Sequence, residues 1–301
     1  MEEIGLIDPK IRTLVTLNDL GSYTKTAEAL SLTQPAISHH IKLLEQEFGI
    51  QIFVKGKRKL KATPEGEVLL KYAHRAIALS ERVHRAIEDC QRAVRTLTVG
   101  ITPTASDIFV PQVLAAYCHN HPETHIQIVR GSIKKIDTML KFYEIDFAIV
   151  DGILPGDHYR QVLMGTDHLC LIVSPKHPFA SRLSVSLDEL QREPLVLRPK
   201  STGTRKLIEG YLVSHGYSLQ DFNVMMEVDS VSTIKDIVEA NLGISIISYG
   251  VCREEQQQGR LIVRPIENCR MVRQVNMVYP QDFEHPEILE EIQREYHSRV
   301  E

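Results

Sequence analysis

The stretch LTQPAISHHIKLLE (residues 32–45) decides the fold of the N-terminal part of the chain. From Gln34 onward its apolar residues recur every three or four positions, which predicts a helix with one buried stripe. That predicted stripe consists of Ile37, Ile41, Leu44 and Phe48. The opposite face gathers Gln34, Pro35, Ser38, His39 and Lys42. These side chains point away from the predicted core, so their hydrogen-bond donors need a partner outside it.

A tight turn joins this helix to a shorter one before it. Residues 10–20 and 24–30 both show helical spacing, and Ser31–Thr33 separate the second helix from the third. Two helices joined in this way form a helix-turn-helix, whose second helix lies in the major groove of DNA. Gln makes a bidentate pair with adenine, and Lys reaches guanine or phosphate. The same pattern also fits a plain corner of two helices with a solvated polar face.

The segment GIQIFVKGKRKLKATPEG (residues 49–66) predicts a β-hairpin with a cationic tip. We expect a strand over Gln51–Val54, a turn around Gly56 and a return strand near Leu60. Residues 1–95 hold 15 Lys and Arg against 12 Asp and Glu, whereas the remainder holds 20 against 27. A basic run is also typical of a solvated surface. Next to a helix-turn-helix it indicates the wing of a winged helix, with Lys55, Lys57 and Arg58 as DNA contacts.

A long helix should follow the hairpin. Thr63 is a predicted N-cap, followed by Pro64 and an acidic Glu65 in the first turn, and the helix has no breaker before Val94. Its apolar residues alternate by three and four positions, which is typical of a coiled coil and indicates self-association. Packing within a single subunit is the alternative. The residues in this repeat are Leu69, Tyr72, Ala76, Leu79, Val83, Ala86, Cys90 and Ala93.

Residues 22–70, SYTKTAEALSLTQPAISHHIKLLEQEFGIQIFVKGKRKLKATPEGEVLL, resemble a LysR-type transcriptional regulator in order and spacing. Weaker matches are HPFA (177–180), GTR (203–205) and VEANLGISIIS (238–248). The resemblance implies double-stranded promoter DNA, RNA polymerase and a homodimer or homotetramer as partners. It also implies that Gln34, Pro35, Ser38 and His39 face the major groove and that Arg58 enters the minor groove. The family often has Arg at the position of His39, so the base preference there stays open.

From Leu97 onward, short apolar strands alternate with helical segments, which predicts an α/β fold with a parallel sheet covered by helices. The predicted strands are 97–101, 125–129, 146–150, 168–173, 195–197, 224–228, 244–247, 261–265 and 272–278. The predicted helices are 107–120, 133–142, 204–215, 232–241 and a final one.

The resemblance implies a type-2 periplasmic-binding-protein-like domain of two α/β subdomains, with an effector in the cleft between them and crossovers near 165 and 268. The expected fold class is therefore α/β, with an N-terminal winged helix-turn-helix and a long linker helix before that domain. The expected boundaries are 1–63 for the DNA-binding domain, 64–95 for the linker and dimerisation helix, and 96–301 for the effector-binding domain. Subdomain I would hold 96–165 and 268–301, and subdomain II 166–267.

Hydroxyl side chains follow several of the predicted strands, where ligands of α/β sheets bind. Hydroxyls and free N–H groups at a helix start can hold a carboxylate, sulfate or phosphate, and Arg205 would add a guanidinium. Ser and Thr are also ordinary helix caps. A threonine-rich first loop resembles regulators of sulfur and amino-acid metabolism, so we expect a small anionic effector of that kind. The predicted effector residues are Thr102, Thr104, Ser132, Ser201, Thr202 and Thr204, with Asp151, Ser230 and Ser248 as weaker candidates.

Other functional classes fit the sequence less well. The chain has no H-E-x-x-H, G-x-S-x-G or P-loop motif, so we expect no catalytic residues, no metal and no cofactor. A transported-solute receptor would share the C-terminal fold but would need an export signal, and the N-terminus MEEIGLIDPK does not resemble one. No apolar run is long enough to cross a membrane, and five scattered cysteines suit a reducing compartment. We therefore expect a cytoplasmic protein without a membrane partner.

Overall fold

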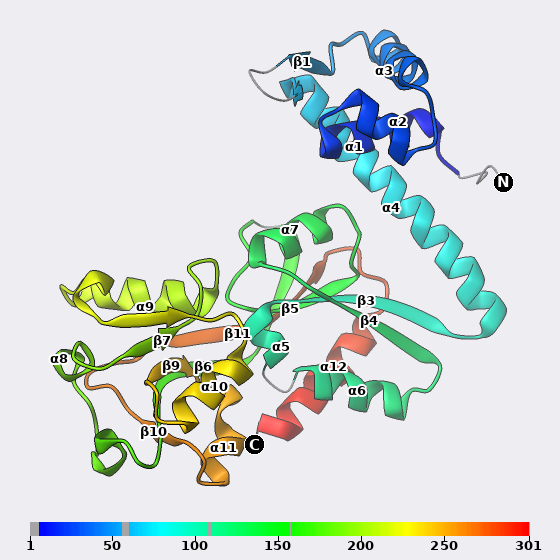
Figure 1. Cartoon of the computed structure of the whole chain (residues 1–301). Coiled ribbons are helices and arrows are strands. Elements are labelled where there is room, and N and C mark those ends of the chain that lie inside the picture. Colours follow the sequence, from blue (N-terminus) through cyan, green and yellow to red (C-terminus); the bar gives the residue numbers. More distant parts are fainter. Residues whose placement is uncertain (1–5, 56–59, 108–109, 157, 301) are drawn as a thin grey trace. The chain divides into compact units, whose positions relative to one another are not determined.

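The computed structural model describes residues 6–55, 60–107, 110–156 and 158–300 (Figure 1). The chain divides into two compact units, one made of Met1–Thr96 with Lys141–Glu144 and the other of Leu97–Leu140 with Ile145–Glu301. Among the described residues, no helix combines the length and the apolar character needed to span a membrane.

The first unit is a winged helix-turn-helix followed by a long helix. Its elements are α1 (Pro9–Leu20), α2 (Tyr23–Ala29), α3 (Gln34–Phe48), β1 (Phe53–Lys55), β2 (Leu60–Ala62) and α4 (Pro64–Arg92). The apolar faces of α1 and α3 meet in one core with the start of α4, through Leu14, Leu17, Ile37, Leu44 and Leu70. The prediction for Phe48 is wrong, because its side chain is 49% exposed. Phe48 is the last residue of α3, and Gly49 ends the helix in a left-handed conformation.

The wing is an antiparallel pair in which Phe53 faces Ala62. Its first strand begins two residues later than predicted, because the N–H of Ile52 donates to the carboxylate of Glu45 (2.8 Å) instead of to a neighbouring strand. The predicted DNA contacts Lys57 and Arg58, at the tip, lie outside the described residues. The long helix ends at Arg92 instead of Val94, since Ala93 takes a positive φ of 52°.

Gly66 packs the first turn of α4 against the wing, because a Cβ atom there would lie 2.3 Å from the carbonyl oxygen of Ile52. Gly66→Ala is expected to lower the unfolding free energy of this unit by about 1 kcal/mol. Overpacking costs about 1–3 kcal/mol, and Ala returns about 0.5–1 kcal/mol of helix propensity. Calorimetry of the full chain measures the change. Gly210→Ala is the control, because it adds a methyl group in open space and should be neutral or stabilising.

The second unit contains two subdomains that share a mixed sheet. The elements of subdomain I are β3 (Arg95–Ile101), α5 (Pro103–Asp107), α6 (Val110–Asn120), β4 (Thr124–Arg130), α7 (Ile133–Lys141), β5 (Phe147–Asp151) and α12 (Pro286–Val300). Those of subdomain II are η1 (Pro178–Ser181), α8 (Leu187–Leu190), β7 (Leu195–Leu197), α9 (Gly203–Ser214), η2 (Leu219–Asp221), β8 (Val224–Glu227), α10 (Val231–Glu239), β9 (Ser245–Ser248), η3 (Tyr249–Val251), α11 (Arg253–Gln257) and β10 (Ile262–Arg264).

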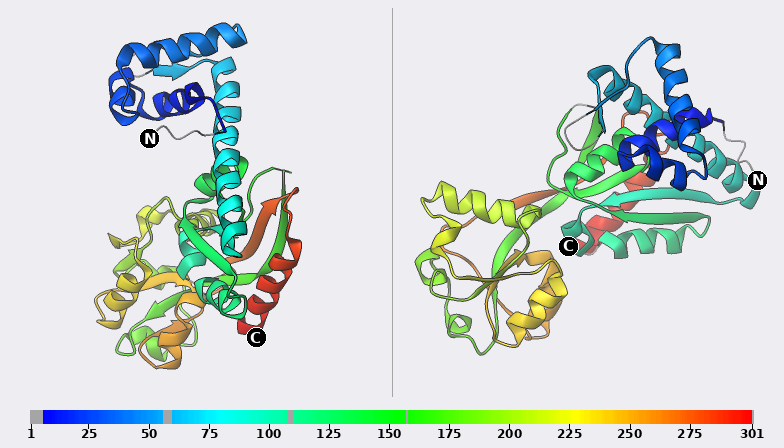
Figure 2. Two further views of the ribbon diagram at one scale, coloured as in Figure 1. Left: turned by 90° about the vertical axis from the view of Figure 1, so that its right-hand side faces the viewer. Right: turned by 45° about the horizontal axis from the view of Figure 1, so that its top comes forward.

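Two long strands, β6 (Tyr159–Val173) and β11 (Val272–Pro280), continue from one subdomain to the other (Figures 1 and 2). The first part of β6 pairs with β11, and its second part pairs with β9 and β10. The expectation of a parallel sheet is therefore only partly correct. β3 is parallel to β5 and β7 to β8, whereas β11 runs antiparallel to β5 and β6. Because β6 and β11 cross between the subdomains in opposite directions, they can pair only in the antiparallel sense.

Candidate functional site

The helix α3 presents the predicted DNA-reading side chains to solvent. Its N-terminus is capped by the hydroxyl of Thr33, which accepts from the N–H of Ala36 (3.3 Å). The five residues predicted for its outer face are all exposed: Gln34, Pro35, Ser38, His39 and Lys42. His40, in contrast, is half-buried and hydrogen-bonded to Thr13 of α1 (2.9 Å). The two adjacent histidines therefore divide between core and surface. Lys55, also predicted to contact DNA, is the last residue of β1.

Two of the predicted effector residues, Thr102 and Thr204, meet at a buried guanidinium. Thr102 follows β3, and its hydroxyl donates to the carboxylate of Asp151 at the end of β5. Arg273 of β11 donates through Nη1 to Oδ2 of Asp151 (3.0 Å) and to Oγ1 of Thr204 in α9 (3.3 Å). The network thus joins subdomain I to subdomain II through a crossover strand.

A second carboxylate completes this network. Asp167 of β6 accepts from Nη2 (2.6 Å) and Nε (3.0 Å) of Arg273, and it also accepts from the hydroxyl of Ser248 and the N–H of Gly250. Arg273, Asp151 and Asp167 are each more than nine-tenths buried. The sequence interpretation found Asp151 and Ser248 as weaker candidates and missed Arg273 and Asp167, since neither follows an apolar strand.

The other predicted effector residues have ordinary structural roles or stay at the surface. Thr202 is 8% exposed and caps α9, accepting from the N–H of Arg205 (3.3 Å) and donating to the carbonyl of Pro199 (2.8 Å). Ser132 accepts from the N–H of Lys135 (3.3 Å) at the start of α7. Thr104 is buried in α5, and Ser201 is exposed. The structure therefore does not gather the six predicted hydroxyls around one cavity.

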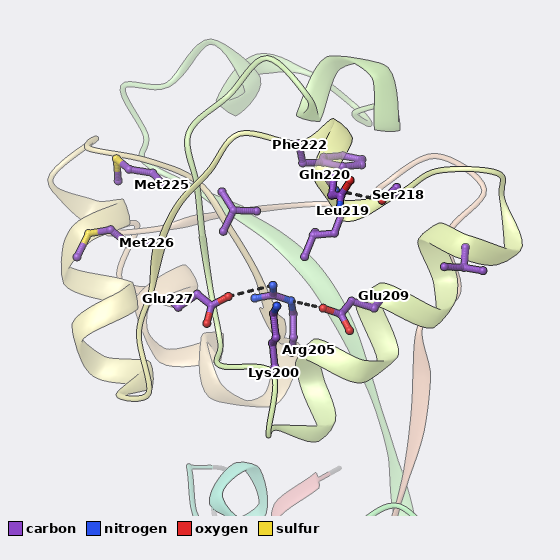
Figure 3. Close-up of a pocket in the computed structure, with 12 residues that line it drawn as sticks. Lys200, Arg205, Glu209, Ser218, Leu219, Gln220, Phe222, Met225, Met226 and Glu227 are labelled. Atoms are coloured by element: carbon purple, nitrogen blue, oxygen red, sulfur yellow. Dashed lines mark hydrogen bonds and ion pairs between the residues drawn. The ribbon is translucent and has the colours of Figure 1, made fainter.

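Arg205 lies in a different pocket, of about 660 Å³, within subdomain II (Figure 3). Its guanidinium pairs with Glu209 (2.8 Å) and Glu227 (3.1 Å) and donates to the carbonyl of Arg198 (3.0 Å). The guanidinium expected to hold a cleft anion is thus already held by two carboxylates. Arg273 is the arginine that reaches a predicted effector hydroxyl.

A pocket of about 490 Å³ lies between the two subdomains. Arg130 from the end of β4 lines it on one side. The start of α10 lines the other, with Ser230, Ser232 and Lys235. Asp229 is the carboxylate among the lining residues, and it pairs with the buried Arg198 (3.1 Å). Two cations, one carboxylate and two hydroxyls make this pocket suitable for an anion. The sequence interpretation included Ser230 as a weaker candidate but missed the two cations; Arg130 directly precedes the predicted Gly131-Ser132 loop.

Lys235 keeps its position in this pocket through Glu255. Its ammonium group donates to the Glu255 carboxylate (2.6 Å) and to the carbonyl of Val251 (3.0 Å). Burial acts to raise the pKa of Glu255, but the hydrogen bond and charge of Lys235 and the charge of Arg260 outweigh it, so this pKa is lowered. Glu255 is therefore ionised at neutral pH and fixes the charged Lys235 at the pocket wall. In the described part of the chain, no cluster of three His, Cys, Asp or Glu side chains suits a metal ion.

A winged helix-turn-helix and a long helix, followed by a two-subdomain α/β ligand-binding domain, define an effector-responsive DNA-binding regulator. The chain belongs to the LysR family of transcriptional regulators, which are not enzymes. The family model described as "Bacterial regulatory helix-turn-helix protein, lysR family" matches residues 10–67, and "LysR substrate binding domain" matches residues 91–297.

Similar proteins of known name agree with this family. The "Probable RuBisCO transcriptional regulator" of Guillardia theta is 30% identical over 283 residues, covering 92% of this chain and 91% of that one. The crystal structure of full-length CbnR complexed with its target DNA has a TM-score of 0.65 at 17% identity, covering 96% and 98% of the two chains. The CcmR regulatory domain of Synechocystis PCC6803 in complex with 2-PG has a TM-score of 0.59 at 19% identity, covering 66% and 96%.

Proposed function

We propose that this regulator binds promoter DNA through the outer face of α3 and responds to a small anionic metabolite held between the effector subdomains. In this proposal residues 1–63 bind DNA, 64–95 dimerise and 96–301 sense the effector. Gln34, Ser38 and His39 contact base edges, and Lys42, Lys55, Lys57 and Arg58 neutralise phosphates or enter the minor groove. RNA polymerase is the proposed partner at the promoter.

The observation that carries the DNA-binding part is the exposure of the whole polar face of α3, next to a core that buries the opposite face. A helix in this position of a winged helix-turn-helix reads the major groove, with its N-terminal residues nearest the bases. The printed description of CbnR, a structure of the same fold, includes target DNA.

The apolar surface of the first unit supports the proposed homodimer. None of the eight residues in the coiled-coil repeat of α4 is buried, and Tyr72 and Leu79 are 58% and 61% exposed. A groove of about 540 Å³ beside them is lined by Ile11, Phe48, Val68, Leu69 and other residues that are mostly apolar. An exposed apolar stripe on a long helix is typical of a coiled-coil partner surface. A second copy of α4 fits it, and a dimer presents two α3 helices to two half-sites.

The pocket between the subdomains supports an anionic effector. Arg130 and Lys235 supply charge, and Ser230 and Ser232 supply hydroxyls at the start of α10. Charge-assisted hydrogen bonds of this type are the stronger ones in proteins. The ligand 2-PG, printed for the CcmR regulatory domain, is one candidate. A sulfur or amino-acid metabolite is another, but Thr102 of the threonine-rich loop is bonded to Asp151, which weakens that argument.

Binding in this pocket would bias the arrangement of the two subdomains, because its walls belong to both. A ligand shifts such an equilibrium only by its difference in affinity for the two arrangements. We propose that the shift changes the spacing of the paired DNA-binding domains and hence the bend of the bound promoter. The response therefore requires both the pocket and the dimer.

A thermal-shift panel of 2-PG, sulfate, thiosulfate, phosphate, acetylated serines and dicarboxylates tests the effector site. Binding to the folded state raises the melting temperature. We expect one anion to do so in the wild type and Lys235→Gln to weaken its affinity about 10- to 100-fold, the loss of a charged hydrogen bond of about 1.5–3 kcal/mol. Lys200→Gln is the matched control, because Lys200 lines the other pocket (Figure 3). A loss with Lys200→Gln and none with Lys235→Gln would move the effector to that pocket.

A further inference from the structure

The carboxylate of Asp151 crosses from subdomain I to the first turn of α9 in subdomain II. Asp151 ends β5, and its Oδ2 accepts from Arg273 (3.0 Å). A Cβ atom at Gly203, the first residue of α9, would lie 3.0 Å from the same oxygen. The absence of a side chain at Gly203 is what permits this approach. A protein carboxylate thus lies at the helix start where the sequence predicted an external anion.

The charges around this contact do not balance. Asp151 and Asp167 share one guanidinium, and all three groups are more than nine-tenths buried. Among the described residues, neither carboxylate has a second cation within ion-pair distance, and the other donors to them are neutral: Thr102, Ser248 and the N–H groups of Asp151's own loop partners and Gly250. A buried charge without a full counter-charge is costly, so the ion pair of Asp151 is the weaker point of the network.

The two carboxylates hold Arg273 unequally. Asp167 takes two hydrogen bonds from the guanidinium, of 2.6 and 3.0 Å, and lies on β6, which pairs directly with the strand that carries Arg273. Asp151 takes one hydrogen bond, of 3.0 Å. Separating the subdomains would therefore break the contact of Asp151 with α9 and Arg273 first and leave the pair of Arg273 with Asp167 in place.

We propose that Asp151 is an internal latch, whose carboxylate ties subdomain I to Arg273 and α9 in the ligand-free protein, and that an anionic effector must break this tie to bind. The second half rests on the proposed effector function. A latch that favours the closed arrangement reduces the apparent affinity of a ligand by the fraction of open molecules. The latch therefore sets the effector concentration at which the regulator responds.

Two variants of the full-length protein test the latch from its two sides. Asp151→Asn keeps the size of the side chain and an oxygen for Thr102, but it removes the charge. Gly203→Ala keeps every charge and places a methyl group against Oδ2 of Asp151. Asp188→Asn is the control, because it removes one charge from an exposed residue of α8 whose bond to Tyr217 an Asn oxygen can replace.

Hydrogen exchange without ligand and calorimetric titration with inorganic phosphate are the two readouts. We expect peptides from the start of α9 and the end of β5 to exchange about tenfold faster in both test variants, and phosphate to bind roughly tenfold tighter than to the wild type. Asp188→Asn should change neither. If Asp151→Asn does not fold, Gly203→Ala decides the outcome alone.

The outcomes separate the latch from the effector function. Unchanged exchange in the folded variants would overturn the latch, whatever phosphate does. Faster exchange with equal or weaker phosphate affinity would overturn the competition between latch and anion. Faster exchange together with no binding of any anion to any form would support the latch and refute the anionic effector.

Discussion

Arg273→Met is expected to destabilise the effector-binding part of the chain by about 3–5 kcal/mol, the cost of leaving a buried charge without its partner. The substitution strands two carboxylates, Asp151 and Asp167, which are both more than nine-tenths buried. Met has a similar volume, so little of the loss comes from packing. Urea unfolding followed by tyrosine fluorescence measures it, since the chain has ten tyrosines and no tryptophan.

Arg270→Met is the matched control for this prediction, because Arg270 is exposed three residues earlier in the chain. An exposed substitution of this kind should change the unfolding free energy by less than about 0.5 kcal/mol. Equal effects of the two variants would mean that the network of Arg273 contributes nothing specific to stability.

Gln34→Ala is expected to weaken binding to the operator by about 1–3 kcal/mol, roughly 5- to 150-fold, with little change on random DNA. Gln34 opens α3 and is exposed at the end that enters the groove. Fluorescence anisotropy measures both affinities, with a promoter fragment selected by the wild-type protein and a scrambled fragment of equal length. Ser38→Ala and His39→Ala should act in the same direction.

Two controls separate base reading from charge in this experiment. Gln46→Ala removes the same chemistry from an exposed position near the other end of α3 and should leave both affinities unchanged. Lys57→Ala should weaken binding to both fragments alike and reduce the salt dependence by about one counterion. Equal losses on the two fragments with Gln34→Ala would remove it from the base contacts.

The helices of the DNA-binding part follow from local signals. Their buried stripes repeat with the helical period, and Thr33 and Gly49 mark the two ends of α3. The error at Phe48 arose because periodicity does not say where the core ends. The first strand of the wing was misplaced by two residues because Glu45, seven residues before Ile52, takes its N–H.

The strands of the second unit were predictable where both faces are buried. β5, β7 and β9 are buried along their whole length and were found within one residue. The first nine residues of β6 were missed, because exposed and buried residues are mixed there and no apolar run marks them. The partners that bury only one side of such a strand are remote in the sequence.

The order of residues was sufficient to predict the winged helix, the exposed reading face, the long helix and the α/β class, because a repeating backbone imposes a repeating pattern of burial. Long-range packing decided the rest. It brought Thr102, Asp151, Asp167, Thr204 and Arg273 into one network and placed Arg130 opposite Lys235. Contacts between charged groups on separate elements leave no periodic trace in the sequence, since they depend only on how strands cross and which helix ends meet.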